Sequence, residues 1–261
     1  MNPSSSGPQA SPVPKVLKAI ADAGAALLAS GGEVHRVEDT MQRLALAYHL
    51  DSVEVIVLPT ALFLNAAGAN TVIRRIRNRS VNLAVVAAIN QLSRDVSEHP
   101  IPLEELEQKL RAARSTSRYR PQANLLFAGV GAAAISQLMG GRVIDILPAL
   151  VGGALTQLAR QWFREIGVAS GVSDMAAAAV AVGPALAAAS LGIFRPGSIL
   201  VAGIMVLTPG LLMTTAVRDG IQGDLLSAAA RILEALLSAG AIAAGASLPL
   251  YFYLALGGRW V

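Results

Sequence analysis

Residues 172–193 read VSDMAAAAVAVGPALAAASLGI, a run of 22 residues made mostly of alanine, valine and leucine. A helix of about 20 such residues is long enough to cross the roughly 30 Å hydrocarbon layer of a bilayer. Four more stretches of similar length and composition lie around it: 123–140, 143–162, 198–217 and 231–256. The sequence therefore predicts a membrane α-helical fold with five transmembrane helices.

The composition supports this prediction and divides the chain. Hydrophobic residues make up 54% of the sequence and charged residues 15%, against about 45–50% and about 25% in ordinary soluble domains. The first 120 residues hold 14 Lys and Arg with 11 Asp and Glu, and the remaining 141 hold only 7 and 6. We expect a disordered tail at 1–14, a small cytoplasmic α+β domain at 15–120 and the five-helix transmembrane domain at 121–261.

Apolar periodicity predicts the elements of the α+β domain. Spacings of three and four residues indicate helices over 15–30 and 33–49, the first ended by Gly31-Gly32. The β-branched runs VEVIV, ALFLNA and TVIRRI predict an antiparallel meander, and two helices follow at 81–96 and 102–114. A domain of about a hundred residues is near the lower limit for burying its own core. We therefore expect it to lean on the membrane domain or on a second copy of the chain.

The basic residues predict the orientation of the spans. They gather before the first span and in the second and fourth connections (Arg111, Arg114, Arg118, Arg120, Arg160, Arg164, Arg218 and Arg231), whereas the other side has one per segment (Arg142, Arg195 and Arg259). Cytoplasmic loops carry the excess of positive charge. The chain is thus expected in a bacterial inner (plasma) membrane with its N-terminus cytoplasmic and its C-terminus outside. Alanine and glycine dominate the spans and predict close helix contacts at Gly141, Gly152-Gly153 and Gly240/Ala244.

The stretch Val206–Glu234 holds most of the candidate substrate-pathway residues. Thr208, Pro209 and Gly210 interrupt an apolar helix, and broken helices in transporters often direct backbone dipoles at a solute. A simple proline kink is the alternative. Asp219-Gly220 and Gly223-Asp224 are expected to form a charged cytoplasmic loop.

Three further charged residues complete the set of candidates in the membrane domain. Arg231 and Glu234 lie three residues apart on one helical face, where Arg231 could bind a substrate carboxylate or the two could form an interfacial ion pair. Asp145 could be a proton site, although its position near Arg142 favours an exposed acid at the membrane boundary.

The rest of the sequence gives little sign of catalysis or cofactor binding. The chain has no cysteine, which excludes disulfides, thiolate catalysis and cysteine-ligated metals. Glu33, His35, Glu38 and Asp39 imitate metal-ligand spacing, but a solvated charged face explains them better. We expect no metal, no cofactor, no nucleic-acid partner and no enzyme activity. The basic run Arg74, Arg75, Arg77 and Arg79 suits anionic lipid headgroups, a partner or a solvated loop.

Two segments resemble motifs of the threonine/serine exporter family, the ThrE-like group that includes YjjP-like bacterial subunits. Gly32-Glu33-Val34-His35-Arg36-Val37-Glu38 is similar to the family's helix start, so Glu33, Arg36 and Glu38 are the cytoplasmic motif residues. Pro209-Gly210, Arg218-Asp219, Gly223-Asp224 and Ala230-Arg231 are similar to its second pattern. The resemblance covers nearly the whole chain after the tail.

This resemblance implies a subunit of a secondary transporter that exports small hydrophilic metabolites, either threonine/serine-type amino acids or dicarboxylates such as succinate. The resemblance also implies coupling to the proton gradient. The resemblance also implies a separate small membrane subunit carrying the second family domain, because the sequence shows only the first. The alternative is a membrane-anchored regulatory or binding protein whose cytoplasmic domain carries the function.

Overall fold

The computed structural model describes residues 12–77, 79–115 and 121–260. Contacts divide the chain into two compact units, the first made of Met1–Arg118 with Thr214–Arg231 and the second of Tyr119–Met213 with Ile232–Val261. Residues 214–231, which the sequence analysis assigned to the transmembrane domain, thus group with the N-terminal part. Most of the expected tail, 1–11, lies outside the described residues, and the first helix begins at Val13.

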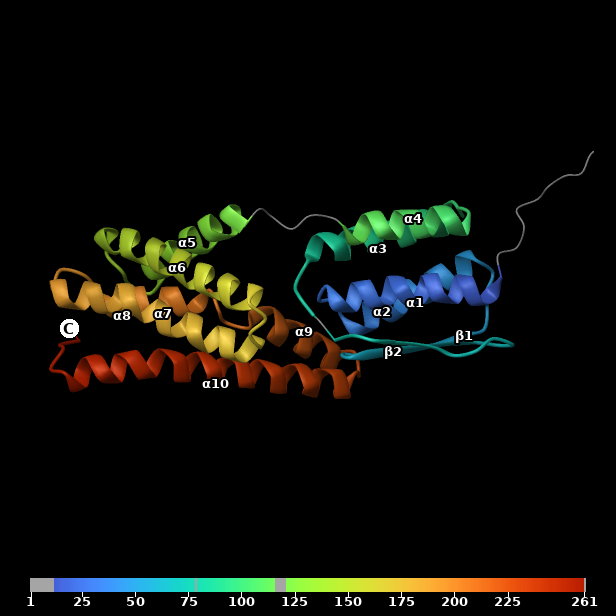
Figure 1. Ribbon diagram of the computed structural model, residues 1–261. Helices are drawn as coiled ribbons and strands as arrows, with labels where there is room; N and C mark the ends of the chain where they lie inside the picture. Colours follow the sequence, from blue (N-terminus) through green and yellow to red (C-terminus); the bar gives the residue numbers. More distant parts are fainter. Residues whose placement is uncertain (1–11, 78, 116–120, 261) are drawn as a thin grey trace, which may run out of the picture. The chain divides into compact units, whose positions relative to one another are not determined.

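The first unit is a layered α+β domain. Its elements are α1 (Val13–Ala29), α2 (Val34–Ala47), β1 (Val53–Leu58), β2 (Ala61–Ala66), β3 (Val72–Arg75), α3 (Leu83–Glu98) and α4 (Leu103–Arg114). The three strands form an antiparallel sheet in the order β1-β2-β3, with Val53 opposite Ala66 and Phe63 opposite Ile73. Figure 1 shows α1 and α2 between this sheet and the layer of α3 and α4. The predicted helices and meander are confirmed.

Helix α1 is the centre of this core because it contacts both other layers. Its fully buried side chains include Leu17, Ile20 and Leu27. Because Gly24 has no side chain, Met41 of α2 and Leu62 of β2 pack closely against α1 at this position. A Cβ added to Gly24 would lie 3.2 Å from Leu62 Cδ2. Burial on more than one face of a helix is expected where it forms the middle layer.

The predicted end of α1 at Gly31-Gly32 is confirmed. Gly31 has a φ of 91°, which side chains with a Cβ rarely adopt. The turn is then tied to the segment before α3, because Ser80 N donates to Ala29 O at 2.8 Å and Asn82 N to Ser30 O at 3.0 Å. Two backbone hydrogen bonds therefore join the end of α1 to the segment that precedes α3.

The second unit is a bundle of helices that run side by side (Figure 1). It contains α5 (Pro121–Leu138), the short helix η1 (Val143–Asp145), α6 (Ile146–Glu165), α7 (Ser170–Leu191) and α8 (Pro196–Met205). Two more helices follow, α9 (Gly210–Ile221) and α10 (Leu225–Ala255). The chain enters the first unit within α9, at Thr214, and returns to the second unit within α10, after Arg231.

Small residues allow these helices to approach closely, as predicted. An added Cβ at Gly153 would lie 2.6 Å from Ala128 O, and one at Gly129 would lie 2.8 Å from Leu150 O. The prediction for Gly240 is wrong, because a Cβ there would meet nothing within 4 Å among the described residues. Gly245, five residues later, packs against the backbone of Met175.

The predicted number of spans is only partly supported. Three helices of the described chain are long and apolar enough to cross a membrane: Val143–Glu165, Ser170–Leu191 and Leu225–Ala255. Helices α8 and α9 make a fourth if the pair, bent by 56°, forms one span. The expected first span, 123–140, corresponds to α5 and is not among these candidates. The chain is a mainly helical, multi-pass membrane protein with a small sheet.

Candidate functional site

The predicted break at Thr208-Pro209-Gly210 is present. Helix α8 ends at Met205 and α9 begins at Gly210, with the 56° bend between them. Thr208 and Gly210 are exposed, and Pro209 is partly buried. Because proline has no backbone N–H, it cannot continue the hydrogen bonds of α8. That the break binds a solute stays a prediction.

Asp219 and Arg231 form a buried ion pair. Arg231 Nε lies 2.8 Å from Asp219 Oδ2, and the two side chains are 5% and 0% exposed. The expected loop at Asp219 is wrong, because this residue lies in the last turns of α9 and the connection begins after Ile221. The helix continues through Gly220 to Ile221, and Asp219 is fully buried within it.

The same arginine links the two motif segments on which the family resemblance depends. Arg231 Nη2 donates to Gly32 O at 2.9 Å, and Arg231 Nη1 donates to Thr215 Oγ1 at 3.5 Å. A second contact lies beside it, where Arg218 Nη1 binds Glu33 Oε1 at 2.6 Å. Residues separated by 185 and 199 positions in sequence therefore meet at the start of α2, all within the first unit.

Several polar atoms of this cluster lack hydrogen bonds. Among the described residues, the buried atoms Glu33 Oε2, Asp219 Oδ1, Asp219 Oδ2 and Arg231 Nε have no hydrogen-bond partner. The 2.8 Å contact between Arg231 and Asp219 is thus an ion pair without good hydrogen-bond geometry. Native proteins leave few buried polar atoms unsatisfied, and those they do leave often serve a function.

The neighbouring acids of α2 behave differently from one another. Glu38 Oε1 accepts a hydrogen bond from Val57 N at 3.0 Å. Burial raises the pKa of Glu38, the charge of Asp224 adds to this effect, and the Val57 N–H opposes it. His35 and Asp39 lie 3.8 Å apart with about half of each side chain exposed (47% and 53%). The prediction of a solvated charged face is therefore right for this pair and wrong for the inward-facing Glu38.

The other acids and motif residues have separate positions. The side chain of Glu33 is only 13% exposed, so it also departs from the predicted solvated face, whereas Arg36 is exposed and its carbonyl accepts from Thr40 Oγ1 at 2.8 Å. In the described chain no group of three or more His, Cys, Asp or Glu residues could hold a metal ion. Glu234 is partly buried on α10 and has contacts of its own.

Asp145 is a structural residue rather than the exposed boundary acid that the sequence favoured. Its side chain is completely buried. Oδ2 accepts from Arg142 N at 2.6 Å, and Oδ1 accepts from Arg195 N at 3.0 Å. Both oxygens therefore hold backbone amides and connect the start of α6 to the start of α8.

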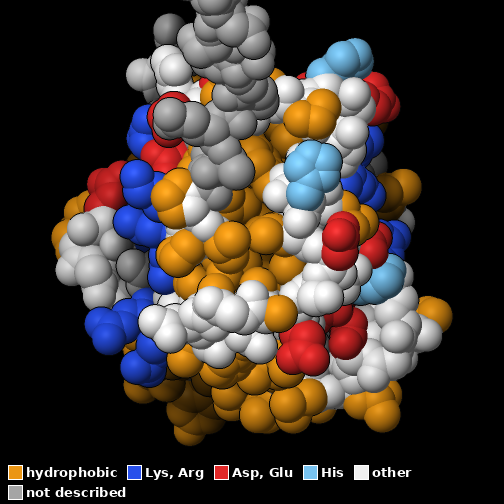
Figure 2. Space-filling view, turned by 90° about the vertical axis from the view of Figure 1, so that its right-hand side faces the viewer, with side chains coloured by type: hydrophobic (Ala, Val, Ile, Leu, Met, Phe, Trp, Pro, Cys, Tyr) orange, Lys and Arg blue, Asp and Glu red, His pale blue; other side chains and the backbone are white. Residues whose placement is uncertain are grey.

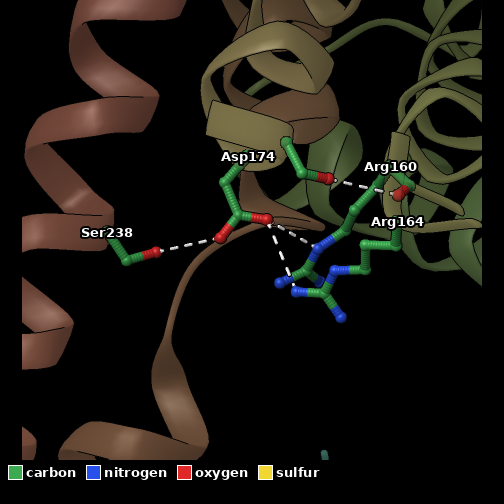
Figure 3. A network of polar contacts seen from close by, with 5 residues as sticks. Arg160, Arg164, Asp174 and Ser238 are labelled. Atoms are coloured by element: carbon green, nitrogen blue, oxygen red, sulfur yellow. Dashed lines mark hydrogen bonds and ion pairs between the residues drawn. The ribbon is translucent and has the colours of Figure 1, made fainter. Parts of the chain in front are cut away.

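Sequence reasoning missed a second buried charged network, centred on Asp174. Figure 3 shows this α7 carboxylate between the arginines of α6 and a serine of α10. Its side chain is 5% exposed; Arg160 Nε lies 2.8 Å from Oδ1, and Arg164 Nη2 lies 3.7 Å from the same atom. Ser238 Oγ donates to Oδ2 at 3.3 Å. The signal that would have found it is an acid close to the start of an apolar span, with two arginines closing the preceding helix.

The basic run after β3 is partly structural. Arg74 Nε lies 2.8 Å from Asp22 Oδ1, whereas Arg75 and Arg77 are exposed. These two arginines and Arg114 line an open hollow of about 370 Å³, which is also lined by Asp22 and by alanines of α1. On the face shown in Figure 2, basic side chains gather mainly on the left and acidic ones mainly on the right, with some of the opposite sign on each side.

Comparisons with known proteins agree with the motifs. A family model described as "Putative threonine/serine exporter" matches residues 18–253. The chain is 26% identical over 229 residues to the "Probable threonine/serine exporter" of Mycobacterium tuberculosis, covering 84% of this chain and 42% of that protein. It is 30% identical over 175 residues to the "Threonine/serine exporter" of Corynebacterium glutamicum, covering 64% and 35%. The chain therefore spans less than half the length of either relative. No solved structure matches it.

Proposed function

This chain belongs to the threonine/serine exporter family, and from that membership we propose that it forms part of a secondary transporter that exports small hydrophilic metabolites. The candidate solutes are threonine/serine-type amino acids and dicarboxylates such as succinate. We place it in the bacterial inner membrane with a cytoplasmic N-terminus, driven by the proton gradient. The positive-inside distribution of arginine supports this orientation.

The observation that carries the proposal is the buried Asp219–Arg231 pair. It belongs to helices that are candidate spans, α10 and the bent pair of α8 and α9. It also contacts the α1–α2 turn of the cytoplasmic domain through Gly32. Charged groups at such positions are costly and are usually retained for a function. A movement that opens this pair would therefore act on the spans and on the cytoplasmic domain together.

The mechanism that we propose is an exchange of partners at Arg231. In the paired arrangement, Arg231 is neutralised by Asp219 and held by Gly32 O. A proton bound at Asp219 Oδ1, which has no hydrogen-bond partner among the described residues, would cancel this attraction. Arg231 would then be available to a solute carboxylate, which a guanidinium binds well through two parallel hydrogen bonds. The break at Thr208–Gly210 would be the hinge and the solute contact, with Glu234 and Asp219 as gate residues.

The partner that we propose is a second membrane domain on a separate subunit. The two relatives are more than twice as long as the portion that this chain matches, since the match covers 42% and 35% of them. We propose a separate small membrane subunit, or further copies of this chain, as the partner. Co-purification of tagged protein from membranes tests the expected partner directly.

An efflux experiment tests the site. Cells producing wild-type protein, Arg231→Ala or Asp219→Asn would be loaded with threonine, serine or succinate, and release would be followed over time. We expect both variants to fall to the level of cells without the protein. Arg111→Ala is the matched control, because this arginine of α4 is 69% exposed and its ion pair lies at 3.6 Å. Unchanged efflux in both site variants would remove the pair from the mechanism.

A second candidate function is regulatory binding by the cytoplasmic domain. The open hollow lined by Arg75, Arg77 and Arg114 supports it, because three arginines around one hollow attract an anionic ligand. A combined Arg75→Ala and Arg77→Ala variant would separate the two functions. Loss of a response to an anionic metabolite with unchanged maximal efflux would favour regulation, whereas identical behaviour in all conditions would exclude it.

A further inference from the structure

The open hollow of the first unit has an excess of positive charge. Arg75, Arg77 and Arg114 line it together with Asp22. The carboxylate of Asp22 is already paired, because its Oδ1 lies 2.8 Å from Arg74 Nε. Among the described residues, Arg75 and Arg77 have no ion pair, and Arg114 donates to the backbone carbonyl of Asp22. The three guanidinium groups therefore give the hollow a net attraction for anions.

Exposed apolar side chains lie beside these arginines. Val81 and Leu83 are 56% and 59% exposed. Their segment is joined to the hollow, because Asn82 N donates at 3.0 Å to the carbonyl of Ser30, and Ser30 lines the hollow. Val85 of α3 lines it as well. Basic groups next to exposed apolar ones are typical of protein surfaces that lie in the headgroup region of an anionic bilayer.

The hollow lies at the end of the first unit where the chain leaves for the second. Arg114 is the last residue of α4, after which the chain passes to the second unit. Arg231, the last residue of the first unit, donates to Gly32 O in the α1–α2 turn, which also contains Ser30. Arg231 belongs to α10, a candidate span. A bilayer crossed by α10 therefore has headgroups near the end of the domain that carries the hollow.

We propose that Arg75, Arg77 and Arg114 bind the phosphate group of an anionic membrane lipid and that Val81 and Leu83 enter the headgroup region beside it. The bound lipid holds this end of the α+β domain at the bilayer surface. The inference goes beyond export, because it concerns how the domain is held and names no exported solute. It also assigns the hollow a different ligand from the soluble anion of the regulatory function.

The surroundings of the hollow favour a lipid over a small soluble anion. A guanidinium binds a phosphate through two parallel hydrogen bonds, whether that phosphate is part of a lipid or free. A free phosphate would contact the arginines only and would leave Val81 and Leu83 in water. A lipid phosphate brings glycerol and acyl carbons to the same place, and these contact the exposed apolar side chains. Because the hollow is open, the headgroup can enter it while the acyl chains stay in the bilayer.

Photo-crosslinking of lipid to the purified full-length chain in a neutral detergent tests the inference. The probe is phosphatidylglycerol with a photoreactive group on its headgroup. Peptide mapping locates the label, which separates this site from lipid bound around the spans, and we expect label on residues 75–85. Unlabelled phosphatidylglycerol should compete at a concentration at least about tenfold lower than phosphatidylcholine with the same acyl chains, and glycerol 3-phosphate should not compete.

Two pairs of substitutions provide the variant and its matched control. Combined Arg75→Gln and Arg77→Gln changes should weaken labelling about 25-fold, because each arginine near an anionic surface contributes about a factor of five. Combined Arg94→Gln and Arg111→Gln changes remove the same charge from positions that do not line the hollow, and they should leave labelling unchanged. All four side chains are exposed, so we expect both variants to fold.

The outcomes separate this inference from both proposed functions. Label that avoids residues 75–85, or an equal loss of labelling in the control pair, would overturn the inference. Competition by glycerol 3-phosphate at the concentration at which phosphatidylglycerol competes would also overturn it and would support the regulatory function, whose ligand is soluble. The crosslinking measures no transport, so absence of efflux for every solute would contradict the proposed export function alone.

Discussion

Replacing Arg231 by methionine leaves Asp219 buried without its cation, and we expect this to be among the most damaging changes in the first unit. The carboxylate is fully buried and its nearest positive charge is Arg231, 2.8 Å away. Removing one member of a buried pair typically costs about 3–5 kcal/mol, because the remaining charge is unsolvated. The change also removes the Arg231 bond to Gly32 O.

The double variant separates the ion pair from the other contacts of Arg231. Asp219→Asn alone leaves the guanidinium bonded to Gly32 O and should cost about 1–3 kcal/mol. With both changes, no buried charge remains unpaired. The double variant should therefore be less destabilised than the sum of the two single variants by about 1–3 kcal/mol.

Thermal unfolding of the detergent-solubilised chain, followed by circular dichroism, measures this coupling. Arg111→Met is the control for loss of an arginine, because exposed ion pairs contribute about 0–1 kcal/mol. The ion pair would not be what fastens α9 and α10 to the α1–α2 turn if the effects of the two changes were additive. The same would follow if Arg231→Met were as stable as Arg111→Met.

Three further outcomes are expected. Gly245→Ala should cost about 1–3 kcal/mol in thermal unfolding, because its Cβ would overlap the Met175 backbone, whereas Gly240→Ala has free space and should be neutral or stabilising. Burial raises the pKa of Glu38 above its ordinary value of 4.5. The protonated carboxyl therefore stabilises the folded chain below pH 4.5, and this stabilisation is lost as the pH rises through the raised pKa. Glu38→Gln should flatten this dependence in melting curves measured over a series of pH values. Tyr48→Phe removes a 2.9 Å hydrogen bond to the carbonyl of Ile101 and should lower the free energy of unfolding by about 0.5–1.5 kcal/mol. It should also remove a phenol titration near pH 12, because burial raises the pKa of Tyr48 to about 12.

Local sequence predicted the elements of the α+β domain closely. The Gly31-Gly32 stop, the three short strands and the acidic first turn of α4 depend on neighbouring residues, so a period or a turn signal is enough to locate them. The break at Pro209 was predictable for the same reason, since proline interrupts a helix in any context. That α8 and α9 together form one broken span stays a prediction, and the five-span count was not confirmed because α5 is not among the candidate spans.

The charged residues show the limit of such reasoning. Asp219 was expected in a loop because glycine follows it, yet it lies in α9 and is buried against Arg231. Asp145 was expected to be exposed, yet it holds two backbone amides. In each case the outcome depends on partners that are distant in sequence, which no local pattern contains.

By itself, the sequence determined that this chain is a helical membrane protein with an α+β domain and the motifs of its family, because hydropathy and periodicity are sums over adjacent residues. Only the tertiary structure decided which charges are buried and which partners they have. It joined Arg231 to Asp219 and Gly32, and Asp174 to the two arginines of α6. The physical reason is that the energy of a buried charge depends on the distance to its counter-ion, and that distance is fixed by folding alone.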